Sequence, residues 1–386
     1  MPQMLSPIPV RELFAYADGQ IRHAAESLWP GAGLALGPHT ASVTGYVRTV
    51  EVNGTVLYAK VSLLGMSLVS VVRGSCGSWS AVRAAQDAYT ASPQTLLARE
   101  AEQLRLLPVA GLRAPLVAGY TGGVLFTQPV VGPTLAEVLV KEPDRTDALC
   151  ARVLREVGEG LARIAPRVTD AVAIGERSIP ATFVRKFNGL SGRAYLEQAG
   201  AHTGVLGAIV ARLQGLRLAP AAASRPVVFG DLKPEHIVFP DGPDGQAAFL
   251  DPGMARGRSQ ADHAKLVSRL ILGLFTAPLS AATVHAITAG LASLVGHTTA
   301  ALTKLERTAW LRELLMLWAM DTVNILSTYL TCPVVLPMPV QAVTLTQKAP
   351  MVLALLDTVS ADLVARQDPR TVWTTTLARL SKAVAV

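Results

Sequence analysis

The sequence predicts a mixed α+β protein of two lobes, with a small β-rich N-terminal lobe and a larger, mostly helical C-terminal lobe. Strand-like runs gather between residues 40 and 131, and helical periodicity dominates after residue 132. One further strand pair is predicted inside the helical half, between residues 236 and 250. Strands followed by helices indicate an α+β organisation, and 386 residues suffice for two lobes.

The N-terminal lobe is predicted to follow a helical extension. Residues 1–36 form this extension, with an amphipathic helix over 10–29 closed by "WPGAG". Tyr46–Val52 and Thr55–Val61 are β-rich runs separated by Asn53-Gly54, which is typical of a tight hairpin because both turn residues accept positive φ. We assign residues 37–131 to the N-terminal lobe.

Residues 61–91 are predicted to be an insertion in this lobe, because apolar pieces alternate there with the break "RGSCGSW". Ser92-Pro93 is typical of an N-cap followed by proline in the first turn, and predicts a helix over 93–107. Two β-like runs follow, around "PLVAGY" and "GVLFTQPVV". Residues 132–386 then form the helical C-terminal lobe, with helices only from about residue 254.

Composition and charge limit the classes of protein to which the chain can belong. The chain is 50% hydrophobic and 16% charged, with a formal net charge of +7. It contains no block of like charges, so we expect no nucleic-acid partner. The apolar region 311–340 is interrupted by charged residues and prolines, which favours a buried helix and no membrane partner. Three widely spaced cysteines and the absence of a secretion-signal pattern predict buried inert thiols and a cytoplasmic location. The oligomeric state stays open.

A short hairpin places several polar residues together. Residues 236–240 and 246–250 flank the turn "DGPDG", and an antiparallel return brings Asp251 beside His236, a few residues from Asp231. Two carboxylates and an imidazole at one end of a hairpin suit divalent-metal binding or acid–base chemistry. On spacing alone, one Asp capping a turn and the other pairing with an arginine is an equal alternative.

Five motifs in order resemble the protein-kinase-like fold. Asp231-Leu232-Lys233-Pro234-Glu235-His236 is similar to the D-L-x-x-x-N catalytic loop, with His in place of Asn, and Asp251-Pro252-Gly253 stands where that fold carries D-F-G. "LYAKV" and "LLAREAEQL" are similar to the strand lysine and its helical glutamate partner, and "VLFTQPVVGPTLAEVL" to the segment linking the lobes. Over residues 40–270 the chain therefore resembles the aminoglycoside phosphotransferase branch of that fold.

The resemblance implies phosphoryl transfer from ATP or GTP with Mg²⁺. Asp231 and Lys233 would be the catalytic residues, with Asp231 accepting or orienting the acceptor hydroxyl. His236 and Asp251 would bind the metal. The residues expected to bind the nucleotide are Lys60 and its partner Glu100, Ser42 and Thr44 over the phosphates, and the backbone of Gln128 to Val130 at the adenine. Glu102 is an alternative partner for Lys60. Asp262 either braces the catalytic loop or lies on the surface.

The function implied is an ATP-dependent phosphotransferase that phosphorylates a hydroxyl group of a small molecule, an antibiotic or another metabolite. Pro252 in place of Phe and the lack of an A-P-E segment argue against a regulated protein kinase. The basic excess after residue 254 favours a neutral or weakly charged acceptor, or a peptide, over a polycation. One alternative is a kinase that phosphorylates Ser or Thr of a ribosomally made peptide before dehydration. The other is a non-catalytic nucleotide-binding pseudokinase.

Overall fold

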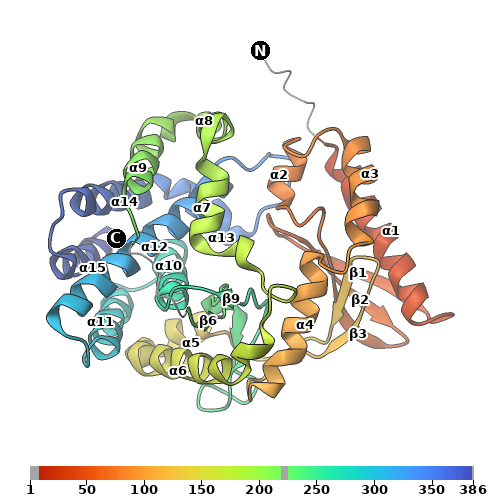
Figure 1. Ribbon diagram of the computed structural model, residues 1–386, viewed down its shortest axis with the longest axis horizontal. Helices are drawn as coiled ribbons and strands as arrows, with labels where there is room; N and C mark the ends of the chain where they lie inside the picture. Colours follow the sequence, from red (N-terminus) through yellow and green to blue (C-terminus); the bar gives the residue numbers. More distant parts are fainter. Residues whose placement is uncertain (1–7, 219–224, 385–386) are drawn as a thin grey trace.

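An antiparallel five-stranded sheet forms the core of the N-terminal lobe. The computed structural model describes residues 8–218 and 225–384 (Figure 1). The strands lie in the order β1-β2-β3-β5-β4. Their bounds are β1 Leu34–Thr40, β2 Tyr46–Val52, β3 Thr55–Val61, β4 Val117–Thr121 and β5 Val124–Thr127. Asn53 and Gly54 both have positive φ, 48° and 80°, so the predicted β2–β3 hairpin is confirmed. Strand β1 was not predicted.

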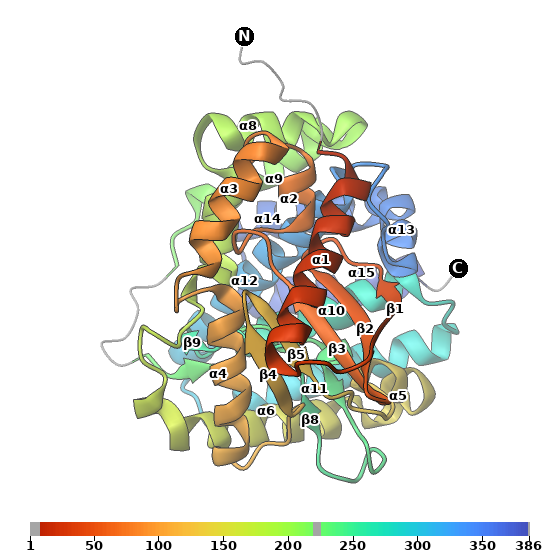
Figure 2. The same ribbon diagram turned by 90° about the vertical axis from the view of Figure 1, so that its right-hand side faces the viewer.

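Helix α1 (Val10–Leu28) covers one face of this sheet, as Figure 2 shows. Its buried residues Ala17, Ile21 and Ala24 pack against the sheet, so the predicted amphipathic helix is confirmed. Side chains alternate along β3, and Ala59 and its buried neighbours face α1. The same alternation turns Lys60 to the opposite face.

Helix α4 (Leu96–Val109) lies beside that opposite face and carries Glu100. Its N-cap is Thr95, whose side chain accepts from the Ala98 N–H, so the predicted start at Ser92-Pro93 is wrong. Tertiary contact explains the difference, because the Thr95 side chain is buried and hydrogen-bonds the Tyr120 hydroxyl at 2.5 Å. Ser92 accepts only from the nearby Gln94 amide.

The insertion 61–91 contains two helices, α2 (Leu68–Val72) and α3 (Trp79–Thr90). The apolar side of α2 packs with Leu336 and Met338 of the C-terminal lobe. Arg73, directly after α2, donates to the Thr331 hydroxyl at 2.8 Å and to Gln198 at 3.1 Å. We call this contact between residues 68–73 and residues 329–338 the clasp; it joins the lobes a second time, in addition to the linker.

The C-terminal lobe is a helical body around α12 (Lys304–Leu330), which is buried from Leu311 through Ser327 apart from two half-buried positions. The predicted buried helix is therefore confirmed for residues 311–327, whereas α12 ends at Leu330 and Val334 and Val335 beyond it are exposed. The remaining helices are α5 Leu135–Lys141, α6 Thr146–Ile164, α7 Ile179–Phe187, α8 Gly189–Glu197, α9 Thr203–Gly215, α10 Ala261–Thr276, α11 Ala281–Thr298, α13 Val340–Gln347, α14 Ala349–Val364 and α15 Pro369–Val384. In the described part of the chain, none of the helices has the length and apolarity that a membrane crossing requires.

Two short strand pairs lie in the helical lobe. The predicted hairpin is present as β7 (Ile237–Val238) and β8 (Ala248–Phe249), which pair antiparallel. A second pair, β6 (Val227–Val228) with β9 (Ala255–Arg256), corrects the prediction that only helices follow residue 254. These ladders hold the segments on either side of Asp231 and Asp251 in fixed positions. Of the three free cysteines, Cys150 alone is fully buried, so the predicted burial holds only for that thiol.

Candidate active site

The β7–β8 hairpin brings Asp231, His236 and Asp251 to one end, as the sequence analysis inferred. The Leu250 amide donates to the His236 carbonyl at 2.8 Å, which fixes the return of the chain. The imidazole Nε2 then lies 3.7 Å from an Asp251 carboxylate oxygen. Its Nδ1 lies 3.9 Å from an Asp231 carboxylate oxygen.

Gly230 and Asp262 hold the loop that carries Asp231. Gly230 has φ +82°, and a Cβ there would lie 2.2 Å from the Gly253 carbonyl oxygen, so only glycine allows the two loops to touch. The Asp262 carboxylate accepts from the Phe229 and Gly230 amides, each at 2.8 Å. Asp262 is therefore a brace of the catalytic loop and not a surface residue. Burial raises the pKa of Asp262 to about 6, although these two hydrogen bonds oppose the shift.

Lys60 lies between two carboxylates. Its ammonium donates to Glu100 at 2.8 Å and contacts Asp251. Glu102, the alternative partner, pairs with Arg105 on the exposed face of α4. Burial opposes the charge of Lys60, but Asp251 and Glu100 together raise its pKa above the usual range. The ammonium therefore stays charged and can attract anionic groups.

Asp251 is held in an uncommon backbone conformation. Its φ is +51°, which costs energy for a non-glycine residue and marks a position fixed by its surroundings. Gln103 supplies part of that support, because its buried amide bonds both the N–H (2.7 Å) and the C=O (2.9 Å) of Met254. Sequence reasoning missed Gln103. Its position three residues after Glu100, on the same face of α4, was the available signal.

Asp231 lies among cationic side chains. Lys233 is 2.6 Å from one of its oxygens and Lys265 is 3.7 Å from the other. Burial opposes ionisation, but Lys233 and Lys265 lower the pKa of Asp231 well below its usual range. Lys265 also pairs with Asp321 at 2.5 Å, and Arg269 lies 3.7 Å from the same carboxylate. Sequence analysis did not find this network, although Asp262, Lys265 and Arg269 share one face of α10.

His236 and Asp251 fit a hard divalent cation supported by phosphate oxygens. Mg²⁺ binds at 2.0–2.1 Å and takes one or two protein ligands, so two donors of one ion lie within about 4.2 Å of each other. The 3.7 Å between Nε2 and the Asp251 oxygen meets this limit. Burial and Lys233 lower the pKa of His236, which favours the neutral imidazole that metals bind. Within residues 8–218 and 225–384, no group of three or more His, Cys, Asp or Glu forms a complete protein cage.

The residues expected at the phosphates lie in the turn between β1 and β2. The Ser42 hydroxyl accepts from the Thr44 amide at 3.2 Å and from the Gly45 amide at 3.4 Å. Helix α2 bonds the same turn, because the Leu68 amide donates to the Thr44 carbonyl at 3.3 Å. Two of the backbone amides in this turn, those of Thr44 and Gly45, therefore already donate to Ser42.

The linker between the lobes begins at Gln128. Its amide donates to the Leu116 carbonyl at 2.9 Å, which leaves its carbonyl, and not its N–H, for a nucleotide base. Val130 is half-buried. Further along, Gly132 packs so closely on Phe239 that a Cβ would lie 2.6 Å from the Phe239 carbonyl oxygen. The linker is thus fixed against the hairpin that carries His236.

Comparisons with known proteins establish the fold. No protein-family model and no curated protein matches the chain. Among solved structures, the amicoumacin kinase hAmiN in complex with AMP-PNP, Ca²⁺ and Ami matches with a TM-score of 0.53 at 12% identity, over 93% of this chain and 97% of that chain. The chain therefore has the two-lobed protein-kinase-like fold.

Two further structures have lower TM-scores. The Plasmodium vivax ethanolamine kinase matches at 0.47, with 12% identity over 89% of this chain and 91% of that chain. The aminoglycoside phosphotransferase APH(4)-Ia matches at 0.44, with 12% identity over 91% of this chain and 99% of that chain.

Proposed function

We propose that this protein is an ATP-dependent phosphotransferase that phosphorylates a hydroxyl group of a small molecule. The observation that carries the proposal is the position of Lys60, whose charged ammonium bridges Glu100 and Asp251 beside Asp231 and His236. This arrangement joins a phosphate-binding cation, a candidate metal site and a candidate base in one cleft. Phosphoryl transfer depends mainly on such positioning and charge stabilisation.

In this proposal each side chain has one task. Lys60 holds the α- and β-phosphates, and Glu100 orients it. Asp231 is ionised and accepts the proton of the acceptor hydroxyl, whose oxygen bonds to the γ-phosphorus as ADP leaves. Lys233, 2.6 Å from Asp231, orients that carboxylate and offsets the charge of the phosphoryl group. Asp251 and His236 would hold Mg²⁺, which supplies charge neutralisation at the phosphates when bound.

The remaining assignments concern the nucleotide contacts, the cellular location and the partners of the enzyme. The Gln128 carbonyl and the Val130 amide meet the adenine, and the turn with Ser42 and Thr44 covers the phosphates. ATP and GTP carry the same three phosphates, so the proposed phosphate contacts apply equally to both nucleotides. We propose a cytoplasmic enzyme without a nucleic-acid or membrane partner.

The two alternatives receive no specific support. The insertion 61–91 and the N-terminal helix are the two segments that could serve a peptide partner. Helix α2 of the insertion packs against Leu336 and Met338 of the same chain, and α1 packs against the sheet. A pseudokinase does not catalyse phosphate transfer and so does not require Asp231, Lys233 and Lys60 to lie together.

Two substitutions test the proposal. We expect Asp231→Asn to reduce phosphate transfer ~10²–10⁴-fold, the usual contribution of a general base, with nucleotide affinity close to normal. Asp251→Ala removes a carboxylate from the candidate metal site and should weaken Mg²⁺–ATP binding as well. ADP release and calorimetric ATP binding are measured for both. Equal loss of nucleotide binding in the two variants contradicts this division of tasks, and absence of Mg²⁺–ATP binding by the unaltered protein contradicts the function.

A further inference from the structure

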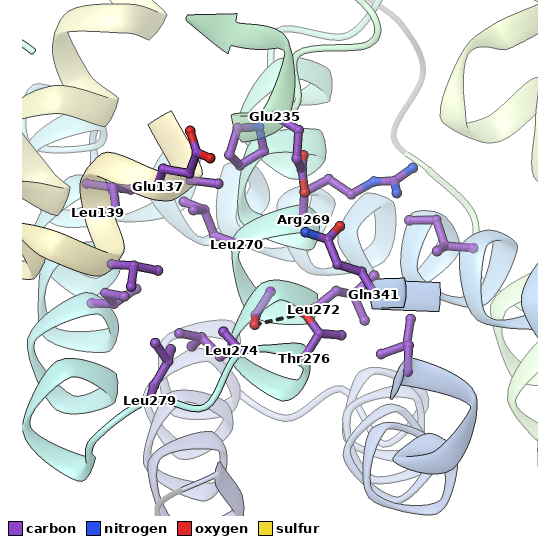
Figure 3. A pocket seen from close by; sticks show the side chains of 18 of the residues that line it. Glu137, Leu139, Glu235, Arg269, Leu270, Leu272, Leu274, Thr276, Leu279 and Gln341 are labelled. Carbon is purple, nitrogen blue, oxygen red and sulfur yellow. Dashed lines mark hydrogen bonds between the residues drawn. The ribbon is translucent and has the colours of Figure 1, made fainter. Parts of the chain in front are cut away.

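A cavity of about 280 Å³ lies directly beneath the catalytic loop in the C-terminal lobe (Figure 3). Pro234 and Glu235, the residues between Lys233 and His236, form part of its wall. Helices α5, α10, α11, α12 and α13 contribute the rest, and no residue of the N-terminal sheet or the linker 128–134 lines it. The cavity is therefore separate from the proposed adenine site and adjoins the loop that carries Asp231.

The body of the cavity is apolar. Leu270, Leu272 and Leu274 of α10 line it, together with leucine and isoleucine side chains of the facing helices. Glu137 lies at its edge, but that carboxylate is already used by the α5 capping box, where it accepts from the Thr134 amide at 2.8 Å. Most of what a ligand would meet in the cavity is hydrocarbon.

The end nearest the catalytic loop holds polar atoms without partners. Within the described residues, Glu235 Oε2 and Arg269 Nε are buried and have no hydrogen-bond partner, and the nearest carboxylate oxygen to Arg269 Nε is that of Asp321 at 3.7 Å. Figure 3 shows both side chains at the same end of the cavity. Buried polar atoms without partners are costly, so a donor and an acceptor on one ligand would be stabilised there.

The charges at the cavity nearly balance. Glu137 and Glu235 line it together with Lys141 and Arg269, and Lys233 and Lys265 flank Asp231. A polycationic acceptor would meet at least as many cations as carboxylates there and would gain no net attraction. The apolar lining instead favours a neutral molecule.

We infer that this cavity binds the apolar part of the phosphate acceptor, and that the acceptor is a neutral amphiphilic alcohol. The inference rests on the proposed phosphotransferase function. A hydroxyl group reaches Asp231 while the hydrocarbon part fills the space between α5 and α10. A second polar group, an amide or hydroxyl, bonds Glu235 and Arg269 at the end nearest the catalytic loop.

Gly273 gives a direct way to block the cavity. It lies in α10 and lines the cavity, and a Cβ at this position would meet no atom within 4 Å. Gly273→Phe therefore fills the cavity without a backbone clash and gains helix propensity. Gly158→Phe is the matched control, because Gly158 is exposed in α6, outside the cavity, with equally open space.

The test combines binding and turnover in the full-length protein. The neutral fluorescent probe N-phenyl-1-naphthylamine is titrated into the unaltered protein and both variants. Chloramphenicol and 1-octanol, which are neutral alcohols, and kanamycin, a polycation, then compete for the probe. ATP affinity and ATP turnover are followed with and without each compound.

We expect Gly273→Phe to weaken probe binding at least tenfold and Gly158→Phe to leave it unchanged. In the unaltered protein and in Gly158→Phe, a neutral alcohol should displace the probe and stimulate ATP turnover, and kanamycin should do neither. In Gly273→Phe the stimulation should be lost. Equal probe binding by all three proteins, stimulation only by kanamycin, or no stimulation by either neutral alcohol overturns the inference. Failure of the proposed function would give a different result from failure of this inference, because Mg²⁺–ATP would then not bind even in the absence of an alcohol.

Discussion

At the residue scale, the candidate site is decided by which charged atoms the backbone brings within 4 Å of one another. The sequence predicted the group of Asp231, His236 and Asp251, because a short hairpin has only one antiparallel return. It did not predict that Asp251 would have φ +51°, or that Lys60 would contact it. Those features depend on how the sheet and the catalytic hairpin approach each other, which no local spacing encodes.

His236 yields a prediction about metal preference. Imidazole is a poorer ligand than oxygen for the hard ion Mg²⁺, and the transition-metal ion Mn²⁺ accepts a nitrogen ligand more readily than Mg²⁺ does. We expect His236→Asn, which restores an oxygen ligand, to retain substantial activity and to shift the preference from Mn²⁺ towards Mg²⁺ severalfold. His236→Ala should weaken nucleotide binding with both ions.

The measurement is ATP binding at fixed Mg²⁺ or Mn²⁺, with rates determined in parallel. If the Asn and Ala variants behave alike with both ions, the imidazole bonds only within the loop and does not bind the metal.

At the element scale, helices α4 and α10 position the site through one face each. Helix α4 directs Glu100 to Lys60 and Gln103 to Met254, while Glu102 faces solvent. The sequence predicted α4 and the Glu100 assignment but placed the start of the helix three residues early, because the contact of Thr95 with Tyr120 is tertiary.

The two faces of α4 allow a substitution on the buried face to be compared with a control on the exposed face. Glu100→Gln removes the charged partner of Lys60 but keeps the size of the side chain. A charge-assisted hydrogen bond contributes about 1.5–3 kcal/mol, so we expect ATP affinity to fall roughly 10- to 100-fold. Glu102→Gln on the exposed face is the control and should change affinity less than about twofold. Calorimetric titration with Mg²⁺–ATP measures both, and similar losses in the two variants would contradict the assignment of Glu100.

Helix α10 supports a pH prediction through Asp262. Its pKa of about 6 in the folded protein exceeds the ordinary value of 3.8, so between these pH values the folded state binds more protons than the unfolded state. Its contribution to the free energy of unfolding is therefore favourable at low pH and is lost as pH rises to about 6. Two pKa units correspond to about 3 kcal/mol.

Asp262→Asn lacks this titration and offers a single oxygen to the two amides. We expect the variant to be less stable at all pH values, with the difference from the unaltered protein shrinking by up to about 3 kcal/mol between pH 4 and pH 7. Urea unfolding at four pH values measures it, with Asp170→Asn, an exposed carboxylate, as control. A constant difference across this range would show that Asp262 does not titrate as described.

At the scale of the whole molecule, the linker and the clasp connect the two lobes. The linker was predicted from the resemblance of "VLFTQPVVGPTLAEVL" to the segment that links the two lobes of the protein-kinase-like fold. The clasp was not predicted, because its contacts join residues more than 250 positions apart in sequence. The order of the motifs was sufficient for the two-lobed fold. The arrangement of the helices that form the apolar cavity was not, since periodicity shows which side of a helix is buried but not its neighbour.

The clasp gives the last prediction. Arg73 donates to Thr331 and lies 4.3 Å from the centre of the Tyr195 ring, so it holds α2 to the C-terminal lobe. Arg73→Ala removes a charged donor and a cation–π contact, each contributing about 1 kcal/mol or more. We expect the free energy of unfolding to fall by ~1–3 kcal/mol and amide exchange to accelerate in residues 63–77 and 329–338, with the middle of α12 unchanged. Arg83→Ala in α3 is the control, because Arg83 lies over Tyr16 within the N-terminal lobe. Hydrogen–deuterium exchange of both variants decides the point: unchanged exchange in residues 63–77 and 329–338 of Arg73→Ala would mean that the apolar contact with Leu336, and not Arg73, holds the clasp closed.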